Sequence, residues 1–123
     1  MDLHRVIRAT LFAIFLAVPA TASAQAAQGP EVNVVLENDD VRMVAVTYQP
    51  GQASPEHTHA VPRTIYVVTG GDLEFTYPDG TTERTSMVAG EANWRAAETH
   101  AVRNVGTTEV VLVETEVRSA GTP

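Results

Sequence analysis

The feature that most constrains this chain is a series of short β-branched runs that end at turn residues. Val41 to Tyr48 is followed by Pro50-Gly51, and Thr64 to Thr69 is followed by Gly70-Gly71. Runs of the same kind cover residues 31–37, 72–77, 81–88, 93–97, 100–104 and 107–117. Turn signals at intervals of about 8–12 residues between such strands are typical of a sandwich or barrel. The pattern predicts an all-β domain of about eight to ten strands without a helix.

The first 24 residues have the pattern of a secretory signal peptide. Arg5 and Arg8 precede an apolar run from Leu11 to Val18, and Ala22-Ser23-Ala24 matches the A-x-A cleavage pattern. The apolar run is too short for a transmembrane helix, which needs about 18 or more apolar residues. We therefore predict a secreted or periplasmic protein with no stable membrane anchor after cleavage.

Cleavage is expected between Ala24 and Gln25, with cleavage after Ala22 or Ala27 as alternatives. The segment has no Arg-Arg pair, which favours the general secretory route over the twin-arginine route. The chain contains no cysteine, so neither a disulfide nor a lipoprotein anchor can form.

The rest of the chain has the length of one domain with one core. We divide it into a lead-in with the first strand at residues 25–40, a barrel at 41–117 and a flexible tail at 118–123. The formal net charge of −7 argues against nucleic acid as a partner, because phosphate binding needs a basic face.

Three histidines of the mature chain form a candidate metal site. His57 and His59 point to the same side of an extended strand because side chains alternate with period 2. His100 begins a later strand. A lone histidine is most often an ordinary hydrogen-bonded residue, but histidine is also the commonest metal ligand, and three placed in this way favour a metal.

The spacing of these histidines resembles the two motifs of the cupins. Gly51, five residues, His57-Thr58-His59, three residues, Arg63, six residues and Gly70 keep the spacing of the first motif, with Arg63 in place of its Glu. His100 and Asn104 match the end of the second motif, while Arg95 and Ala97 replace its Pro and Gly. The resemblance covers about Val41 to Val117, and a narrower likeness is to small bacterial cupins associated with β-alanine degradation.

The resemblance implies a double-stranded β-helix, the jelly-roll barrel of the cupins. It implies that His57, His59 and His100 converge on a divalent metal inside this barrel. In the family the Glu of the first motif supplies a fourth, anionic ligand, which this chain lacks. Asn104, in the family, usually supports a loop rather than the metal.

The role of Arg63 is left open by the sequence. If the alternation from His57 continues past Pro62, Arg63 points inward, where an unpaired guanidinium is costly to bury. Three arrangements avoid this cost: Arg63 turns outward to solvent, pairs with Glu56 or Glu98, or binds the carboxylate of a substrate.

Three neutral imidazoles with an open position suit iron, zinc, copper or nickel better than manganese or magnesium. We therefore predict an exported metal-binding cupin with a small anionic ligand or substrate. One alternative is a metal-dependent oxygenase, lyase or isomerase acting on a small carboxylated metabolite. Another is a metal-free ligand-binding or structural barrel. Small cupins commonly form dimers, and Val110 to Val117 would suit an edge strand paired between copies, so a homodimer is one predicted assembly.

Overall fold

The computed structural model of the protein describes residues 28–121, almost all of them in strands or turns. Its elements are β1 (Glu31–Glu37), β2 (Val41–Tyr48), β3 (His57–His59), β4 (Arg63–Thr69), β5 (Gly71–Thr76), β6 (Thr82–Met87), β7 (Ala92–Arg95), β8 (Glu98–Asn104), β9 (Val110–Val117) and the 3₁₀ helix η1 (Arg118–Gly121). These strands agree with the predicted segments, because β-branched runs bounded by Gly, Pro, Asn and Asp form and end strands.

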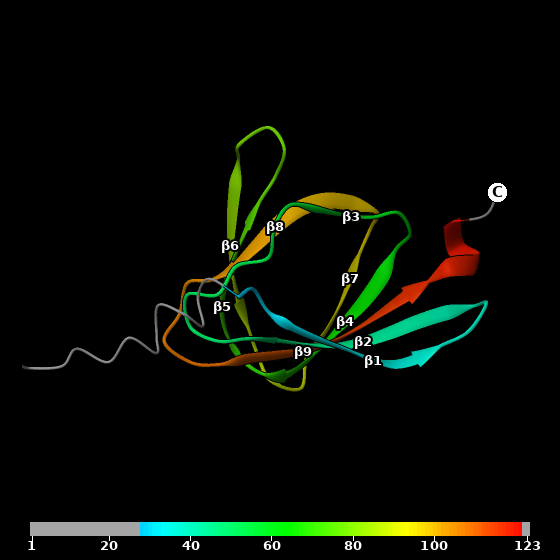
Figure 1. Ribbon diagram of the computed structural model, residues 1–123, viewed down its shortest axis with the longest axis horizontal. Helices are drawn as coiled ribbons and strands as arrows, with labels where there is room; N and C mark the ends of the chain where they lie inside the picture. Colours follow the sequence, from blue (N-terminus) through cyan, green and yellow to red (C-terminus); the bar gives the residue numbers. More distant parts are fainter. Residues whose placement is uncertain (1–27, 122–123) are drawn as a thin grey trace, which may run out of the picture.

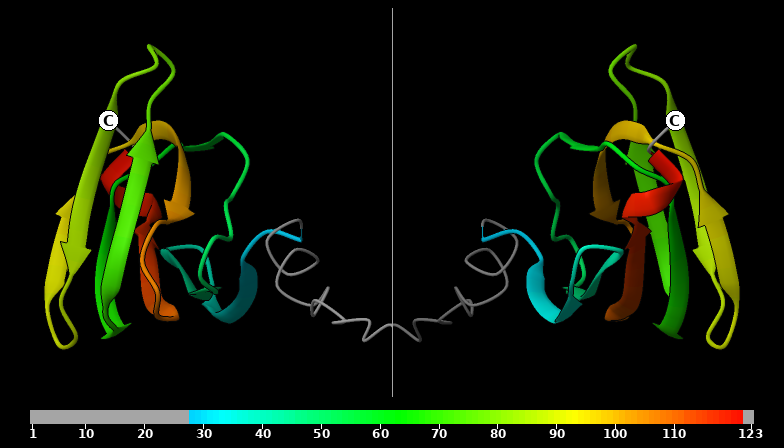
Figure 2. Two further views of the ribbon diagram at one scale, coloured as in Figure 1. Left: turned by 90° about the vertical axis from the view of Figure 1, so that its left-hand side faces the viewer. Right: turned by 90° about the vertical axis from the view of Figure 1, so that its right-hand side faces the viewer.

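The strands form two antiparallel sheets that face each other (Figure 1). One sheet has the order β1-β2-β9-β4-β7, and the other has the order β3-β8-β5-β6. The chain passes repeatedly from one sheet to the other, and the views in Figure 2 show the β5–β6 hairpin extending beyond the rest of the barrel. This arrangement is the predicted double-stranded β-helix, and the fold class is confirmed.

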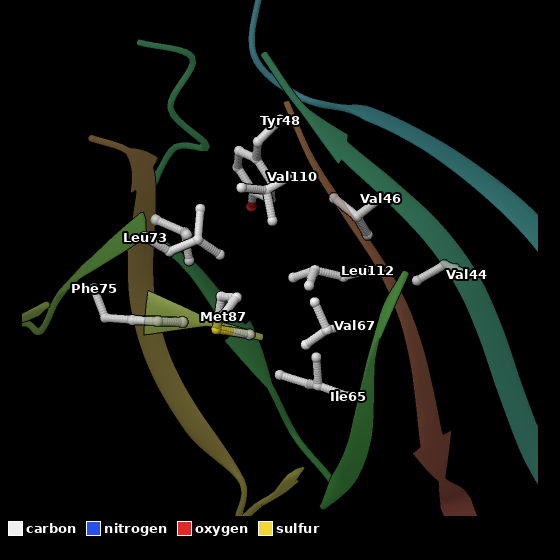
Figure 3. Close-up of a cluster of buried hydrophobic side chains, with 11 residues drawn as sticks. Val44, Val46, Tyr48, Ile65, Val67, Leu73, Phe75, Met87, Val110 and Leu112 are labelled. Atoms are coloured by element: carbon white, nitrogen blue, oxygen red, sulfur yellow. The ribbon is translucent and has the colours of Figure 1, made fainter. Parts of the chain in front are cut away.

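The core lies between the inner faces of the two sheets (Figure 3). Alternate residues of β2, β4, β5 and β9 point into it, as the period of 2 along a strand requires. Its members are Val44, Val46, Tyr48, Ile65, Val67, Leu73, Phe75, Met87, Val102, Val110 and Leu112. The apolar side chains fill one part of the barrel, and the polar site described below occupies the part beside His100.

Two glycines of the first motif are required for different structural reasons. Gly51 has a φ of 82°, which only glycine adopts readily, and its amide bonds to the carbonyl of Asn104. Gly70 has no such angle, but a Cβ there would lie 2.4 Å from the carbonyl oxygen of Met87. Gly70 therefore allows the close approach of β4 and the end of β6.

The last strand is not an edge strand, contrary to our expectation. β9 lies between β2 and β4 and pairs with both along its length. Its backbone groups are used within one copy, so the prediction that Val110 to Val117 pairs between two copies is wrong. In the part of the chain that the structure describes, the outer strand of this sheet beside β2 is β1, whose valines and Leu36 are exposed.

The structure describes the chain from residue 28 and ends at residue 121. The predicted signal peptide and its cleavage site between Ala24 and Gln25 lie outside the described residues and stay predictions. Where a flexible tail was expected, residues 118–121 form η1, and Arg118 donates hydrogen bonds to the carbonyl of Asn38 and to Glu37. No helix among residues 28–121 is long and apolar enough to cross a membrane.

The buried Tyr48 should make the stability of the fold depend on pH in the alkaline range. Burial raises the pKa of Tyr48 to about 12, above the value of about 10 for an unfolded tyrosine. The folded protein therefore holds this proton more tightly, and stability should fall as the pH rises from about 10 to about 12, by about 1.4 kcal/mol per pH unit. Urea unfolding at several pH values should show this loss in the wild type and a smaller one in Tyr48→Phe.

The exposed Tyr66 provides the control for this measurement. Tyr66→Phe removes a hydroxyl from an exposed side chain and leaves Tyr48 in place, so the wild-type pH dependence should remain. An equal alkaline loss in Tyr48→Phe and in the wild type would contradict the assignment to Tyr48.

Candidate metal centre

The pairing of β3 with β8 brings the three histidines together. His57 lies directly opposite His100, and His59 lies opposite Glu98. Directly opposed residues share one face of a sheet, as do residues two apart along a strand. The four side chains therefore form a quadrilateral on the inner face, and His100 is fully buried at 1% exposure.

The histidine rings are arranged around a common point. The ring centroid of His57 lies 4.9 Å from that of His59 and 4.9 Å from that of His100, and His59 and His100 are 5.2 Å apart. Each pair of rings meets edge to face. One ring nitrogen of each residue lies within 4.8 Å of the others. The structure thus brings together the three predicted ligands.

Hydrogen bonds at the outer nitrogens fix the form of two rings. His57 Nδ1 lies 2.9 Å from the carbonyl oxygen of Pro55, and His59 Nδ1 lies 3.1 Å from Glu116 Oε1. A carbonyl and a carboxylate only accept, so each Nδ1 carries the proton and donates it. In the neutral ring the Nε2 atom then carries a lone pair.

The two lone pairs point at each other. His57 Nε2 and His59 Nε2 are 3.1 Å apart, and two acceptors at this distance repel unless a proton or a metal cation lies between them. Nitrogens that each lie about 2.0–2.1 Å from a tetrahedral metal are about 3.3–3.4 Å apart. The observed separation is close to this value, so the residues present fit a metal ion.

The surroundings disfavour a proton in this position. Burial lowers the pKa of His59, and the charge of Arg63 lowers it further. Burial also lowers the pKa of His100 to about 3. The Nδ1 atom of His100 is buried without a hydrogen-bond partner among the described residues, 3.4 Å from Glu98 Oε1. Neutral, desolvated imidazoles are the form that binds metal.

Arg63 lies beside the histidines, inside the barrel. Its side chain is 1% exposed, and it donates from Nη2 to Glu98 at 2.9 Å and from Nε to Glu114 at 3.1 Å. Of the three arrangements that the sequence left open, the structure shows the pairing with Glu98, while Glu56 is exposed. Because two carboxylates already engage the guanidinium, the binding of a substrate carboxylate by Arg63 stays a prediction.

Arg95 completes this charged cluster. It donates to Glu98 at 2.7 Å, and its guanidinium carbon lies 4.2 Å from the ring centroid of Phe75. Burial alone would raise the pKa of Glu98, but hydrogen bonds from Arg95 and Arg63 outweigh it, so the pKa is lowered. Glu98 is therefore ionised and bridges two arginines.

A cavity of about 370 Å³ opens onto the histidines. Its wall is mostly apolar and carries a few charged groups. It includes Val32, Val44, Val46, Tyr48, Pro55, His57, His59, Glu114 and Arg42. A second hollow, of about 380 Å³, shares Gln28, Gly29 and Pro30 with it but contains no histidine. The first cavity is therefore the one that gives a small molecule access to the site.

Comparison with known proteins identifies the family. The sequence profile described as Cupin domain matches residues 44–116, more than half of the chain. The chain belongs to the cupin family. The match runs from β2 to β9 and includes all three histidines, which agrees with the resemblance of the two motifs.

Three bacterial proteins are among those similar to this cupin. It is 33% identical over 86 residues to "Beta-alanine degradation protein BauB" of Pseudomonas aeruginosa, across 69% of this chain and 90% of that protein. A cupin domain from Bordetella pertussis is 27% identical in its crystal structure, with 72% of this chain and 93% of that chain covered and a TM-score of 0.68. A Klebsiella pneumoniae protein with a double-stranded β-helix domain, 24% identical with a TM-score of 0.62 over 77% of this chain and 82% of that chain, supports the fold alone.

Asn104 has the supporting position expected in a cupin. Its side-chain amide donates to the carbonyls of Tyr48 at 2.9 Å and Thr108 at 2.8 Å, and its Oδ1 accepts from the amide of Gly106 at 3.0 Å. These bonds tie the end of β2 to the β8–β9 turn. Asn104 therefore holds the backbone rather than a ligand.

Sequence reasoning missed the two acids on β9. Glu114 and Glu116 face the interior, where Glu114 pairs with Arg63 and Glu116 holds His59. A signal was present, because both have the same parity as the buried Val110 and Leu112. Acidic residues on the apolar side of a strand need a buried cation or donor, which would have pointed to Arg63 and His59.

Removal of Arg63 should expose the cost of an unpaired buried carboxylate. Glu98 would keep Arg95, but Glu114 would lose the one cation that the described residues supply to it. Arg63→Met should therefore destabilise the protein by about 3 kcal/mol, measured by urea unfolding. Adding Glu114→Gln should restore part of this loss. A double variant less stable than Arg63→Met would contradict the proposed pairing.

The charge of Glu116 should matter for the metal. Glu116→Gln keeps an oxygen that can accept from His59 Nδ1 but removes the negative charge that makes the ring a better ligand. Metal affinity, measured by competition with a chromogenic chelator, should fall by roughly 10- to 100-fold. Glu109→Gln, an exposed substitution at the approach to the same strand, should leave it unchanged. Equal affinity in both variants would contradict this role.

Proposed function

We propose that this cupin binds a divalent transition metal through His57, His59 and His100 and presents it to a small ligand in the adjacent cavity. The observation that carries the proposal is the 3.1 Å distance between His57 Nε2 and His59 Nε2. The Nδ1 atom of each ring already donates a hydrogen bond, so neither Nε2 carries a proton. The proposal includes export, which the basic and apolar pattern of residues 1–24 supports.

The ligand chemistry narrows the choice of metal. Three neutral imidazoles suit iron, zinc, copper or nickel, whereas magnesium and manganese prefer carboxylate oxygens. When bound, such a metal supplies Lewis acidity and, if it is redox-active, oxygen chemistry. Nearby carboxylates are committed elsewhere, since Glu116 holds His59 and Glu98 and Glu114 bind Arg63.

The chain's own residues orient the ligands and balance the charge. Glu116 and the carbonyl of Pro55 keep the protons on the outer nitrogens of His59 and His57. Arg63 and Arg95 together neutralise Glu98 and Glu114 and keep them in place. The site thus keeps three neutral ligands beside a cavity with an apolar wall.

Elemental analysis of purified protein tests the metal site. Wild-type protein from cells supplied with mixed metals should contain close to one metal ion per chain, and His100→Ala should lose it. Thr58→Ala is the matched control, because Thr58 lies between two ligands on the exposed face of β3. Equal metal content in the wild type and in His100→Ala would sink the proposal.

The cavity also favours a catalytic use of the site. Its wall includes His57 and His59, so a molecule bound there meets the metal ligands directly. The relative from Pseudomonas aeruginosa is named for the degradation of β-alanine, a short amino carboxylate. We therefore propose, as a second candidate, a metal-dependent oxygenase, lyase or isomerase acting on a small carboxylated metabolite. A metal-loaded wild type that converts no short carboxylate while binding it would favour a non-catalytic ligand-binding protein.

A further inference from the structure

One arginine of the cavity wall makes a long ion pair but no side-chain hydrogen bond within residues 28–121. Arg42 lies on β2, on the same face as Val44 and Val46, and its side chain is one-third exposed at 33%. The nearest carboxylate oxygen, of Glu37, is 3.9 Å from its Nε and is bound more closely by Arg118. Arg42 therefore reaches the cavity with unused donors.

The other described arginines provide a contrast. Each of Arg63, Arg84, Arg95, Arg103 and Arg118 donates at least one hydrogen bond to a carboxylate or carbonyl. Among residues 28–121, Arg42 is the one arginine whose side chain donates no hydrogen bond. A guanidinium has five donors in a planar fork, and this fork matches a carboxylate.

The position of Arg42 relates it to the metal centre. In the register of the sheet Arg42 lies opposite Glu116, the acid that holds His59, and Val44 lies opposite Glu114. Arg42 is thus at the histidine level of the barrel, and Val44 and Val46 continue the apolar wall away from it. A molecule in the cavity meets the histidines, an apolar surface and one guanidinium that makes no side-chain hydrogen bond.

We propose that Arg42 binds the carboxylate of a small aliphatic acid whose other end reaches the three-histidine site. This inference rests on the proposed function and gives its ligand class. The volume of about 370 Å³ lies at the small end of the range of about 300–1,000 Å³ for ligand cavities. Arg42 takes the role that the sequence suggested for Arg63, whose donors are held by Glu98 and Glu114.

The charges around Arg42 favour a single negative charge on the ligand. Three acids face this region: Glu37 from β1, and Glu114 and Glu116 from β9. Glu114 is neutralised by Arg63, whereas Glu37 is shared with Arg118. One guanidinium among these acids balances a monocarboxylate better than a phosphate, which carries more charge and would be repelled.

Calorimetric titration with butyrate tests the proposal, with butyramide as the neutral probe of the same shape. Each variant is titrated in zinc-loaded and metal-free form after its metal content has been measured. Wild type should bind butyrate and not butyramide, and Arg42→Gln should bind butyrate roughly 10- to 100-fold more weakly. Arg42→Lys, which keeps the charge but not the fork, should fall between them. Arg84→Gln, on the exposed face of β6, should match the wild type.

The outcomes separate this inference from the metal site. Arg42→Gln that keeps its zinc but loses butyrate binding supports the role of Arg42. Wild type that holds none of iron, zinc, copper and nickel would overturn the proposed function, while Arg42-dependent butyrate binding by the metal-free protein would still support the role of Arg42. Equal butyrate binding by wild type and Arg42→Gln, or no binding by wild type in either form, would overturn the inference.

Discussion

The pairing of the three-residue strand β3 with β8 is the contact on which the rest of the site depends. It places His57 opposite His100 and His59 opposite Glu98, on a face that turns into the barrel. A shift of β3 by one residue would turn His57 and His59 to the outer surface, away from His100. The strand is short, but its register is also held by the bond from the amide of Ser54 to Val102 and by the contacts of Asn104 with the end of β2.

Arg63 occupies the position of an acid in the cupin motif, and the negative charge near the site lies on other residues. At the position where the first cupin motif has Glu, this chain has a buried cation, and Glu98 and Glu114 neutralise it. A further acid, Glu116, acts on the histidines from outside through His59. The carboxylates thus form an outer layer around three neutral ligands, so that the charge of a bound metal would be balanced at a distance.

Arg63 and Arg42 both lie on inner faces of the barrel but differ in burial and in the acids available to them. Arg63 is fully buried, and its donors are taken by acids from β8 and β9. Arg42 lies nearer the mouth of the cavity, where water can satisfy it and its nearest acid is shared with Arg118. Arg42, held by a 3.9 Å ion pair beside an apolar wall, is tolerated there because its side chain is one-third exposed at 33%.

The sequence was sufficient to predict the strands and the three histidines of the candidate metal site. Strand runs were recognisable because β-branched residues and turn residues act locally, and His57 and His59 share a face because the strand period is 2. The link to His100 came from the spacing of two motifs rather than from local physics. The acids Glu114 and Glu116 were missed although their parity with Val110 and Leu112 marked them as inward-facing.

By itself the sequence determined an all-β chain with three histidines available on strand faces. Only the tertiary structure decided that β9 lies inside a sheet, that Arg63 faces Glu98 and Glu114, and that the side chain of Arg42 makes no hydrogen bond within the described residues. The partners of Arg63 lie 35 and 51 residues away along the chain. Such pairings depend on which strands become neighbours and in what register, which is settled when the two sheets close over their common core and is not encoded within any single strand.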